Sequence, residues 1–161
     1  SDSQAGAFVI AMQIGQALSN LFFGFLADRW GHKLSLELSA LVSTVSLVLA
    51  IMAPSPTWFY AVFFFRGAVI AGTYISGISI VLEFTGPESR PTYIGLANTI
   101  PGVAAAVAPL IGGWLAGAVS YRAMFILTAV IAVASWVLLR FTVREPRHLS
   151  RSSLPSDQPV V

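Results

Sequence analysis

One arginine lies inside an otherwise apolar run and is the residue best suited to recognise a charged group. Arg66 is the only basic residue well within a hydrophobic segment, about eight residues from the nearer end of the run 58–83. A guanidinium at that depth is costly, so it should face a watery cavity or extend back to the lipid headgroups. Helical spacing places Thr73 on the same face and Tyr74 beside it. These three residues are candidates to line a ligand pathway.

Amide side chains provide a second set of candidates. Gln13, Gln16 and Asn20 follow the spacing i, i+3, i+7 and share one helix face. They could form a polar wall that contacts a solute, or hydrogen bonds between helices, and the sequence leaves both open. Asn98 lies in a run rich in glycine and proline, which predicts either a bent helix or close packing through small residues.

Hydropathy predicts the elements that carry these residues. The chain has 161 residues, 56% hydrophobic and 10% charged, against about 25% charged residues in soluble domains. A helix crosses the hydrocarbon core with roughly 20 residues, and five runs are long enough: about 5–27, 34–53, 58–83, 92–119 and 122–141. We therefore predict an all-α polytopic membrane protein, with a transmembrane helical bundle over residues 1–141. The polar, Pro- and Ser-rich segment 142–161 is expected to be a disordered cytoplasmic tail.

Basic residues predict the orientation of these spans. Seven of the nine fall on one side: Arg29, Lys33, Arg90, Arg140, Arg144, Arg147 and Arg151. The opposite side carries only Arg122. The positive-inside rule then places the charged loops and the C-terminus in the cytoplasm of an integral protein of the plasma (inner) membrane. The net charge of +2 has this topological explanation, and we expect no nucleic-acid partner.

A polar stretch, GFLADRWGHK at residues 24–33, interrupts the apolar runs. Gly31 would supply the backbone freedom that a sharp reversal needs, and Gly24 would let a neighbouring helix approach closely. Arg29 and Lys33 would hold the loop on the cytoplasmic side. Asp28 contributes little to topology, but an acid suits a nearby helix N-terminus.

This stretch resembles the G-x-L-a-D-r-x-G-r-k signature of the major facilitator superfamily of secondary transporters. His32 stands where Arg or Lys is usual. A P-E-x-R loop at 87–90 and a final V-R-E-P-R extend the resemblance over all five runs. It implies five transmembrane helices that form most of one six-helix bundle, with helices eight to twelve expected and two to six as the alternative.

The resemblance also implies a gating role for the polar stretch, in which Asp28 braces a helix of the opposite half. Glu83 would pair with Arg29 or Arg90. A purely topogenic turn is the alternative. The implied gating set is Gly24, Asp28, Arg29, Gly31, Lys33, Glu83 and Arg90.

The predicted function is part of a secondary active transporter that moves a small solute by alternating access. Coupling to H+ or Na+, or efflux, stays open; the expected partners are the solute, the lipid bilayer and the remaining helices of the full-length transporter. A non-transporting fragment that packs against a partner bundle is the alternative. An enzyme is disfavoured because His32 and His148 lie outside the spans and cysteine is absent. We expect no catalytic residue, metal site or cofactor.

Overall fold

The computed structural model describes residues 2–143 as a bundle of long helices. Within that range no strand occurs, and each long helix is apolar enough to cross a membrane, so the predicted all-α polytopic fold is confirmed. The helices are α1 (Asp2–Trp30), α2 (His32–Met52), α3 (Phe59–Phe84), α4 (Arg90–Ala118) and α5 (Tyr121–Thr142), with a short 3-10 turn η1 (Pro56–Trp58) before α3. These bounds lie within about three residues of the spans expected from hydropathy. Of the predicted tail, 142–161, Thr142 is the last residue of α5, and the part from position 144 on lies outside the described residues.

Local sequence explains where each helix stops. A single residue, Gly31, separates α1 from α2 at a φ of 96°, which side chains other than hydrogen rarely tolerate. Pro54 and Pro56 follow α2 and cannot continue it. Ser120 caps α5, since its hydroxyl accepts a hydrogen bond of 3.1 Å from the backbone N–H of Ala123. Short connections of this kind force neighbouring helices to run antiparallel.

The tightest packing joins α1 to α3. Gly15 and Gly67 make this possible, because a Cβ on Gly15 would overlap the Phe64 carbonyl oxygen and one on Gly67 would overlap that of Met12. The two backbones therefore touch directly, as small residues allow in membrane helices. Gly24, which was expected to permit a close approach, has no described atom within 4 Å of an added Cβ. Among the described helices, the close contact of α1 lies at Gly15, about two and a half turns away, and the expectation for Gly24 stays a prediction.

Replacing Gly15 with alanine is expected to lower stability by about 1–3 kcal/mol, because the new methyl would overlap backbone atoms that cannot rotate away. Thermal unfolding of the purified protein in detergent measures the effect. Gly6→Ala in the same helix is the matched control, since its Cβ would meet nothing within 4 Å. An equal unfolding temperature for both variants would contradict this account of the contact.

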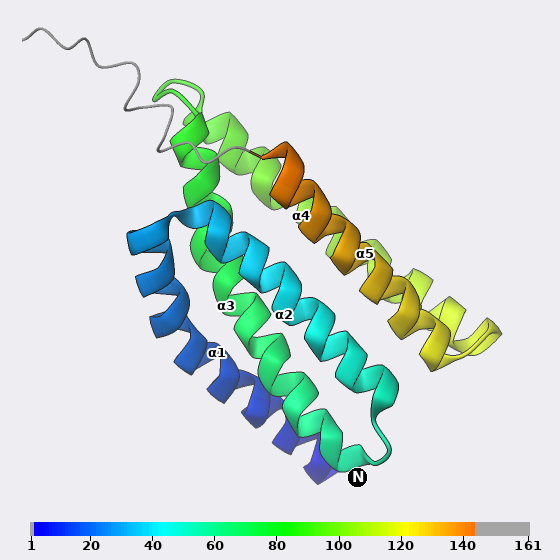
Figure 1. Ribbon diagram of the computed structural model, residues 1–161. Helices are drawn as coiled ribbons and strands as arrows, with labels where there is room; N and C mark the ends of the chain where they lie inside the picture. The colour runs from blue at the N-terminus through cyan, green and yellow to red at the C-terminus, as the bar shows by residue number, and fades with distance from the viewer. Residues whose placement is uncertain (1, 144–161) are drawn as a thin grey trace, which may run out of the picture.

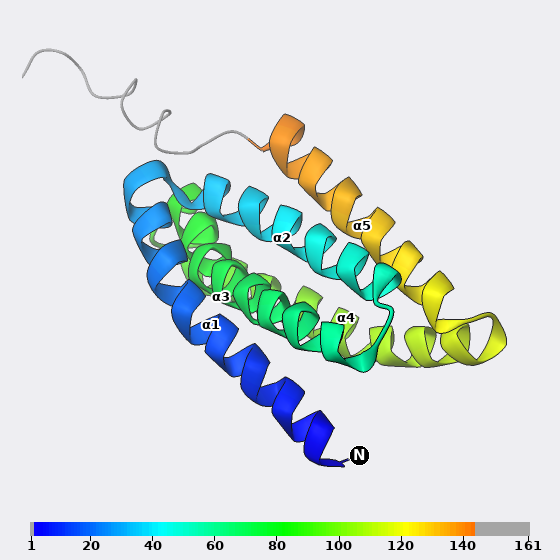
Figure 2. The same cartoon turned by 60° about the horizontal axis from the view of Figure 1, so that its bottom comes forward.

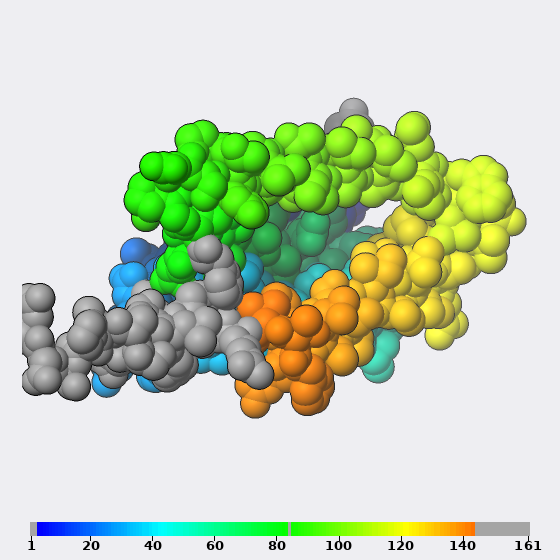
Figure 3. All heavy atoms as spheres, turned by 90° about the horizontal axis from the view of Figure 1, so that it is seen from above, coloured from blue at the N-terminus to red at the C-terminus, as the bar shows by residue number. Residues whose placement is uncertain are grey.

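The helices α2 and α5 form the other side of the bundle. Figure 2 shows α2 between α3 and α5, and it packs against both of them. The helix α4 contacts α3 and α5 more sparsely, and none of its residues is buried. It continues as one helix through Pro101 and Pro109. Figure 3 shows α4 and α5 diverging, with α3 visible in the hollow between them.

Charged connections gather at one end of the bundle. The α1–α2 junction, the α3–α4 turn and the end of α5 lie at this end in Figure 1, opposite the chain start and the α2–α3 connection. Arg29, Lys33, Arg90 and Arg140 therefore share one end, whereas Arg122 begins α5 at the other. This is the alternation that five antiparallel spans require.

Candidate functional site

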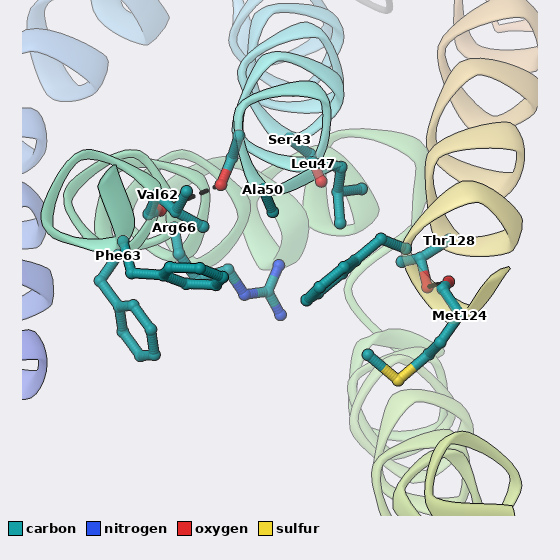
Figure 4. A pocket seen from close by; sticks show the side chains of 11 residues that line it. Ser43, Leu47, Ala50, Val62, Phe63, Arg66, Met124 and Thr128 are labelled. Carbon is teal, nitrogen blue, oxygen red and sulfur yellow. Dashed lines mark hydrogen bonds between the residues drawn. The ribbon is translucent and has the colours of Figure 1, made fainter. Parts of the chain in front are cut away.

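The first candidate site is a cavity of about 370 Å³ between α2, α3 and α5. Figure 4 shows the Arg66 guanidinium extending from α3 into this space, toward α5. The walls are predominantly apolar and include three phenylalanines. The lining residues are Ser43, Ser46, Leu47, Ala50, Phe59, Val62, Phe63, Arg66, Met124, Phe125 and Thr128.

The polar groups of this cavity leave the arginine without a counter-charge. No carboxylate lines the cavity, and within residues 2–143 Arg66 has no hydrogen-bond or ion-pair partner. Ser46 donates its hydroxyl proton to the Val62 carbonyl at 2.9 Å, and Thr128 donates to the Met124 carbonyl at 2.9 Å. The cavity thus combines one cation with apolar walls and hydroxyl oxygens that can still accept hydrogen bonds.

A second cavity, of about 610 Å³, lies between α3 and α4. It brings together three residues that the sequence singled out separately, namely Thr73 and Tyr74 from α3 and Asn98 from α4. Tyr74 is 74% exposed, so its ring stands open to whatever fills this groove. The remaining lining residues are small or apolar: Gly77, Ile78, Val81, Ala97, Pro101, Gly102 and Ala105. Thr73 shares the Arg66 face of α3, yet the two side chains line different cavities.

The amides of α1 line neither of these two cavities. Gln13 and Asn20 are exposed, and Gln16 is half-buried beside the close contact with α3. The structure therefore does not place them beside Arg66 or Asn98. Their assignment to a pathway stays a prediction.

The polar stretch of the α1–α2 junction lies at the charged end of the bundle. Asp28 is exposed in the last turn of α1, where the negative end of the helix dipole disfavours an acid. The Arg29 guanidinium carbon lies 5.5 Å from the Trp30 ring centroid and 6.0 Å from that of Phe25, within the range of cation–π attraction. Gly31 has the positive φ that the sharp reversal requires.

Two polar contacts at this end were not anticipated from the sequence. Glu37 of α2 is only 5% exposed and lies between two cations: the Lys33 Nζ is 3.3 Å from its Oε1, and the Arg140 Nη1 is 3.5 Å from its Oε2. Lys33 also donates to the Arg140 carbonyl at 3.4 Å. The spacing of Lys33 and Glu37, i and i+4, could have indicated half of this cluster. The link to α5 joins residues far apart in sequence.

The other contact joins α2 to α3 through His32. Its Nδ1 lies 3.4 Å from the hydroxyl of the buried Ser76, and its Nε2 lies 4.0 Å from the Glu83 Oε1. The expected pairing of Glu83 with Arg29 or Arg90 stays a prediction; the contact with His32 is an ion pair only when the imidazole is protonated. Gly72 and Ser76 lie on the same side of α3 as Glu83 and are buried, so this side of α3 packs the bundle.

These features define a polytopic α-helical integral membrane protein with polar groups facing cavities between its spans. A comparison with protein families matches residues 1–160 to the Major Facilitator Superfamily. The chain belongs to this family. The resemblance drawn from GFLADRWGHK is thereby confirmed.

Individual relatives agree with this family assignment. The chain is 29% identical to the cis,cis-muconate transport protein of Acinetobacter baylyi over 95% of the chain and 36% of the relative. It is 33% identical to the multidrug resistance protein MdtG of Yersinia enterocolitica over 80% of the chain and 31% of that protein. Solute carrier family 22 member 1 of Oryctolagus cuniculus is 36% identical over 53% of the chain and 15% of its own length.

The chain thus spans roughly a third or less of the length of these curated relatives. Their family comprises transporters, and this agrees with the prediction that the chain is not an enzyme.

Proposed function

We propose that this chain is one helical bundle of a secondary active transporter that moves a small solute across the plasma membrane by alternating access. The observation that carries the proposal is the α3–α4 cavity, where Thr73, Tyr74 and Asn98 converge between two membrane-spanning helices. Polar side chains at membrane depth typically mark solute pathways. In this family, binding sites lie between helices near the bilayer midplane, around which bundles rock.

The solute itself is not defined by similarity. The relatives carry names as different as a muconate transport protein and a multidrug resistance protein. Coupling to H+ or Na+, and uptake or efflux, are both compatible with the proposal. The sparsely packed α4 exposes apolar side chains such as Leu110 and Trp114, at 73% and 71%. Lipid and the remaining helices of a longer protein are the partners that suit this surface.

The test is uptake of a radiolabelled solute panel into proteoliposomes that contain the longer protein. Asn98→Leu should reduce uptake of the transported solute about fivefold or more, because a polar group of the bound solute that loses its hydrogen-bond partner costs about 1–3 kcal/mol. Thr99→Leu is the matched control, since Thr99 is the next residue on α4 and does not line the cavity. Normal uptake by Asn98→Leu would remove this cavity from the pathway.

The absence of uptake of every solute, with protein correctly inserted, would favour the alternative of a non-transporting bundle that packs against a partner.

We further propose that the charged end of the bundle faces the cytoplasm. Cysteine placed at Ser55, in the α2–α3 connection, should react with an impermeant maleimide added outside intact cells. Cysteine at Glu88, in the exposed α3–α4 turn, should react only after the membrane is permeabilised. Both positions are exposed, so differences in reactivity report the side of the membrane. Labelling of both from outside would overturn the orientation.

A further inference from the structure

We propose that the Arg66 cavity binds the carboxylate of a small organic anion with an apolar, ring-sized body. This inference rests on the proposed transport function and names the substrate class. It concerns the cavity between α2, α3 and α5, which is separate from the α3–α4 groove that carries the transport proposal.

The positive charge of Arg66 has no described counter-charge. A guanidinium inside a span costs at least about 2.5–3.5 kcal/mol on insertion scales, so a compensating group is required. Among the described acids outside α3, Asp28, Glu37 and Glu88 lie at the charged end of the bundle. Asp2 begins α1 at the opposite end, 13 residues or about 20 Å from Gly15, the α1 residue that packs against Phe64. Along α3 itself, Glu83 is 17 residues from Arg66, about 25 Å at a rise of 1.5 Å per residue. No described carboxylate can reach the guanidinium.

Comparison with three cations at the α1–α2 junction and the end of α5 supports this step. Lys33 and Arg140 have Glu37 between them, and Arg29 lies over the Trp30 ring. Arg66 has neither kind of partner within residues 2–143, and its side chain extends into open space (Figure 4). A ligand anion would supply the missing charge. Guanidinium and carboxylate fit each other through two parallel N–H···O bonds.

The side chains that line the cavity indicate that the remainder of the ligand is apolar. Phe59, Phe63 and Phe125 contribute three aromatic side chains, and Leu47 and Met124 add further apolar surface. A volume of about 370 Å³ lies within the 300–1,000 Å³ of small-molecule sites. An apolar body gains free energy by leaving water for such walls. A strongly hydrated phosphate would instead need several donors, and the lining offers a single cationic side chain.

The experiment compares three probes that share a phenyl ring and a similar size but differ in charge. Benzoate, benzyl alcohol and benzylammonium are titrated into the purified longer protein in detergent, with binding followed by calorimetry. We expect benzoate to bind at least about tenfold more tightly than benzyl alcohol, because a charge-assisted bond is worth about 1.5–3 kcal/mol. Arg66→Leu should abolish this preference. Arg66→Lys should retain part of it, since a lysine keeps the charge and loses the planar fork.

Two further variants make the result specific to this cavity. Arg122→Leu removes an exposed cation at the start of α5 and should leave benzoate binding unchanged. Phe125→Ala leaves every charge in place and should weaken benzoate several-fold relative to acetate, because it removes an aromatic wall. If Arg66→Leu fails to fold, Arg66→Lys and Phe125→Ala decide the question.

Several results would overturn the inference. Equal binding of benzoate and benzyl alcohol, or a benzoate preference that survives in Arg66→Leu, would show that Arg66 is a headgroup anchor. Tighter binding of benzylammonium would show that an acid on another helix neutralises Arg66. Uptake of neutral or cationic solutes without any anion preference would leave the transport proposal intact and refute this one. Arg66-dependent benzoate binding in a protein that transports no solute would support this inference and refute the transport proposal.

Discussion

Replacing Asp28 with asparagine is expected to slow solute transport by about 10–100-fold while membrane insertion stays normal. Asp28 lies in the last turn of α1, where its own helix dipole disfavours a negative charge. An acid at such a position gains no stabilisation from the dipole of its own helix, and we propose that it braces a helix N-terminus of the opposite half when the cytoplasmic side is closed. Loss of charge-assisted hydrogen bonds costs about 1.5–3 kcal/mol, which corresponds to this change in rate.

Initial uptake rates at equal surface expression measure the effect of Asp28→Asn and of the neighbouring Arg29→Ala. Glu88→Gln is the matched control, because Glu88 is an exposed acid at the same end of the bundle. Transport at the parental rate by both variants would make residues 24–33 a topogenic turn only.

The second large effect is expected for Glu37→Gln, which should weaken the attachment of α5 to α2. Glu37 is 5% exposed and within 3.5 Å of both Lys33 and Arg140. The neutral amide would leave two cations without a counter-charge, and Lys33 has only 16% of its side chain exposed. A buried charged group that loses its partner costs about 1–3 kcal/mol or more. We expect an unfolding temperature several degrees lower in detergent.

The rate of disulfide cross-linking distinguishes a weaker attachment of α5 from a general loss of stability. Disulfide cross-linking between cysteines at Leu36 and Leu139, near the charged ends of α2 and α5, should become slower in Glu37→Gln. Arg140→Leu removes the same ion pair with α5 and should also slow cross-linking, but it should lower the unfolding temperature less, because Lys33 still balances Glu37. Unchanged stability and cross-linking in Glu37→Gln would show that the cluster does not hold α5.

Much of the fold could be predicted because each membrane span appears in the sequence as one continuous apolar run. Every backbone polar group in the hydrocarbon core must be satisfied within its own helix, so each span needs an uninterrupted apolar run. The expected runs 34–53 and 122–141 correspond to α2 and α5 within two residues. The role of Gly31 as the turn between two helices could likewise be predicted, because a one-residue reversal requires a conformation that glycine tolerates.

Contacts between helices could not be predicted in the same way. Hydropathy gives the depth of a side chain but not the neighbour it meets, since lipid is as apolar as another helix. Gly24 and Gly15 are both glycines of α1, yet only Gly15 touches α3. Glu37 and Arg140 are separated by 103 positions and meet only because α5 packs on α2.

For the candidate site, too, one part follows from the sequence and another part only from helix packing. The sequence by itself determined that Arg66 and Thr73 lie on one face of a membrane-spanning helix, because that follows from helical spacing alone. Tertiary structure decided that Arg66 faces α2 and α5, with aromatic walls around it, whereas Thr73 faces α4 and Asn98. One helix face can serve two cavities because different neighbours cover its two halves. Helix packing sets those neighbours through long-range contacts that no local pattern encodes.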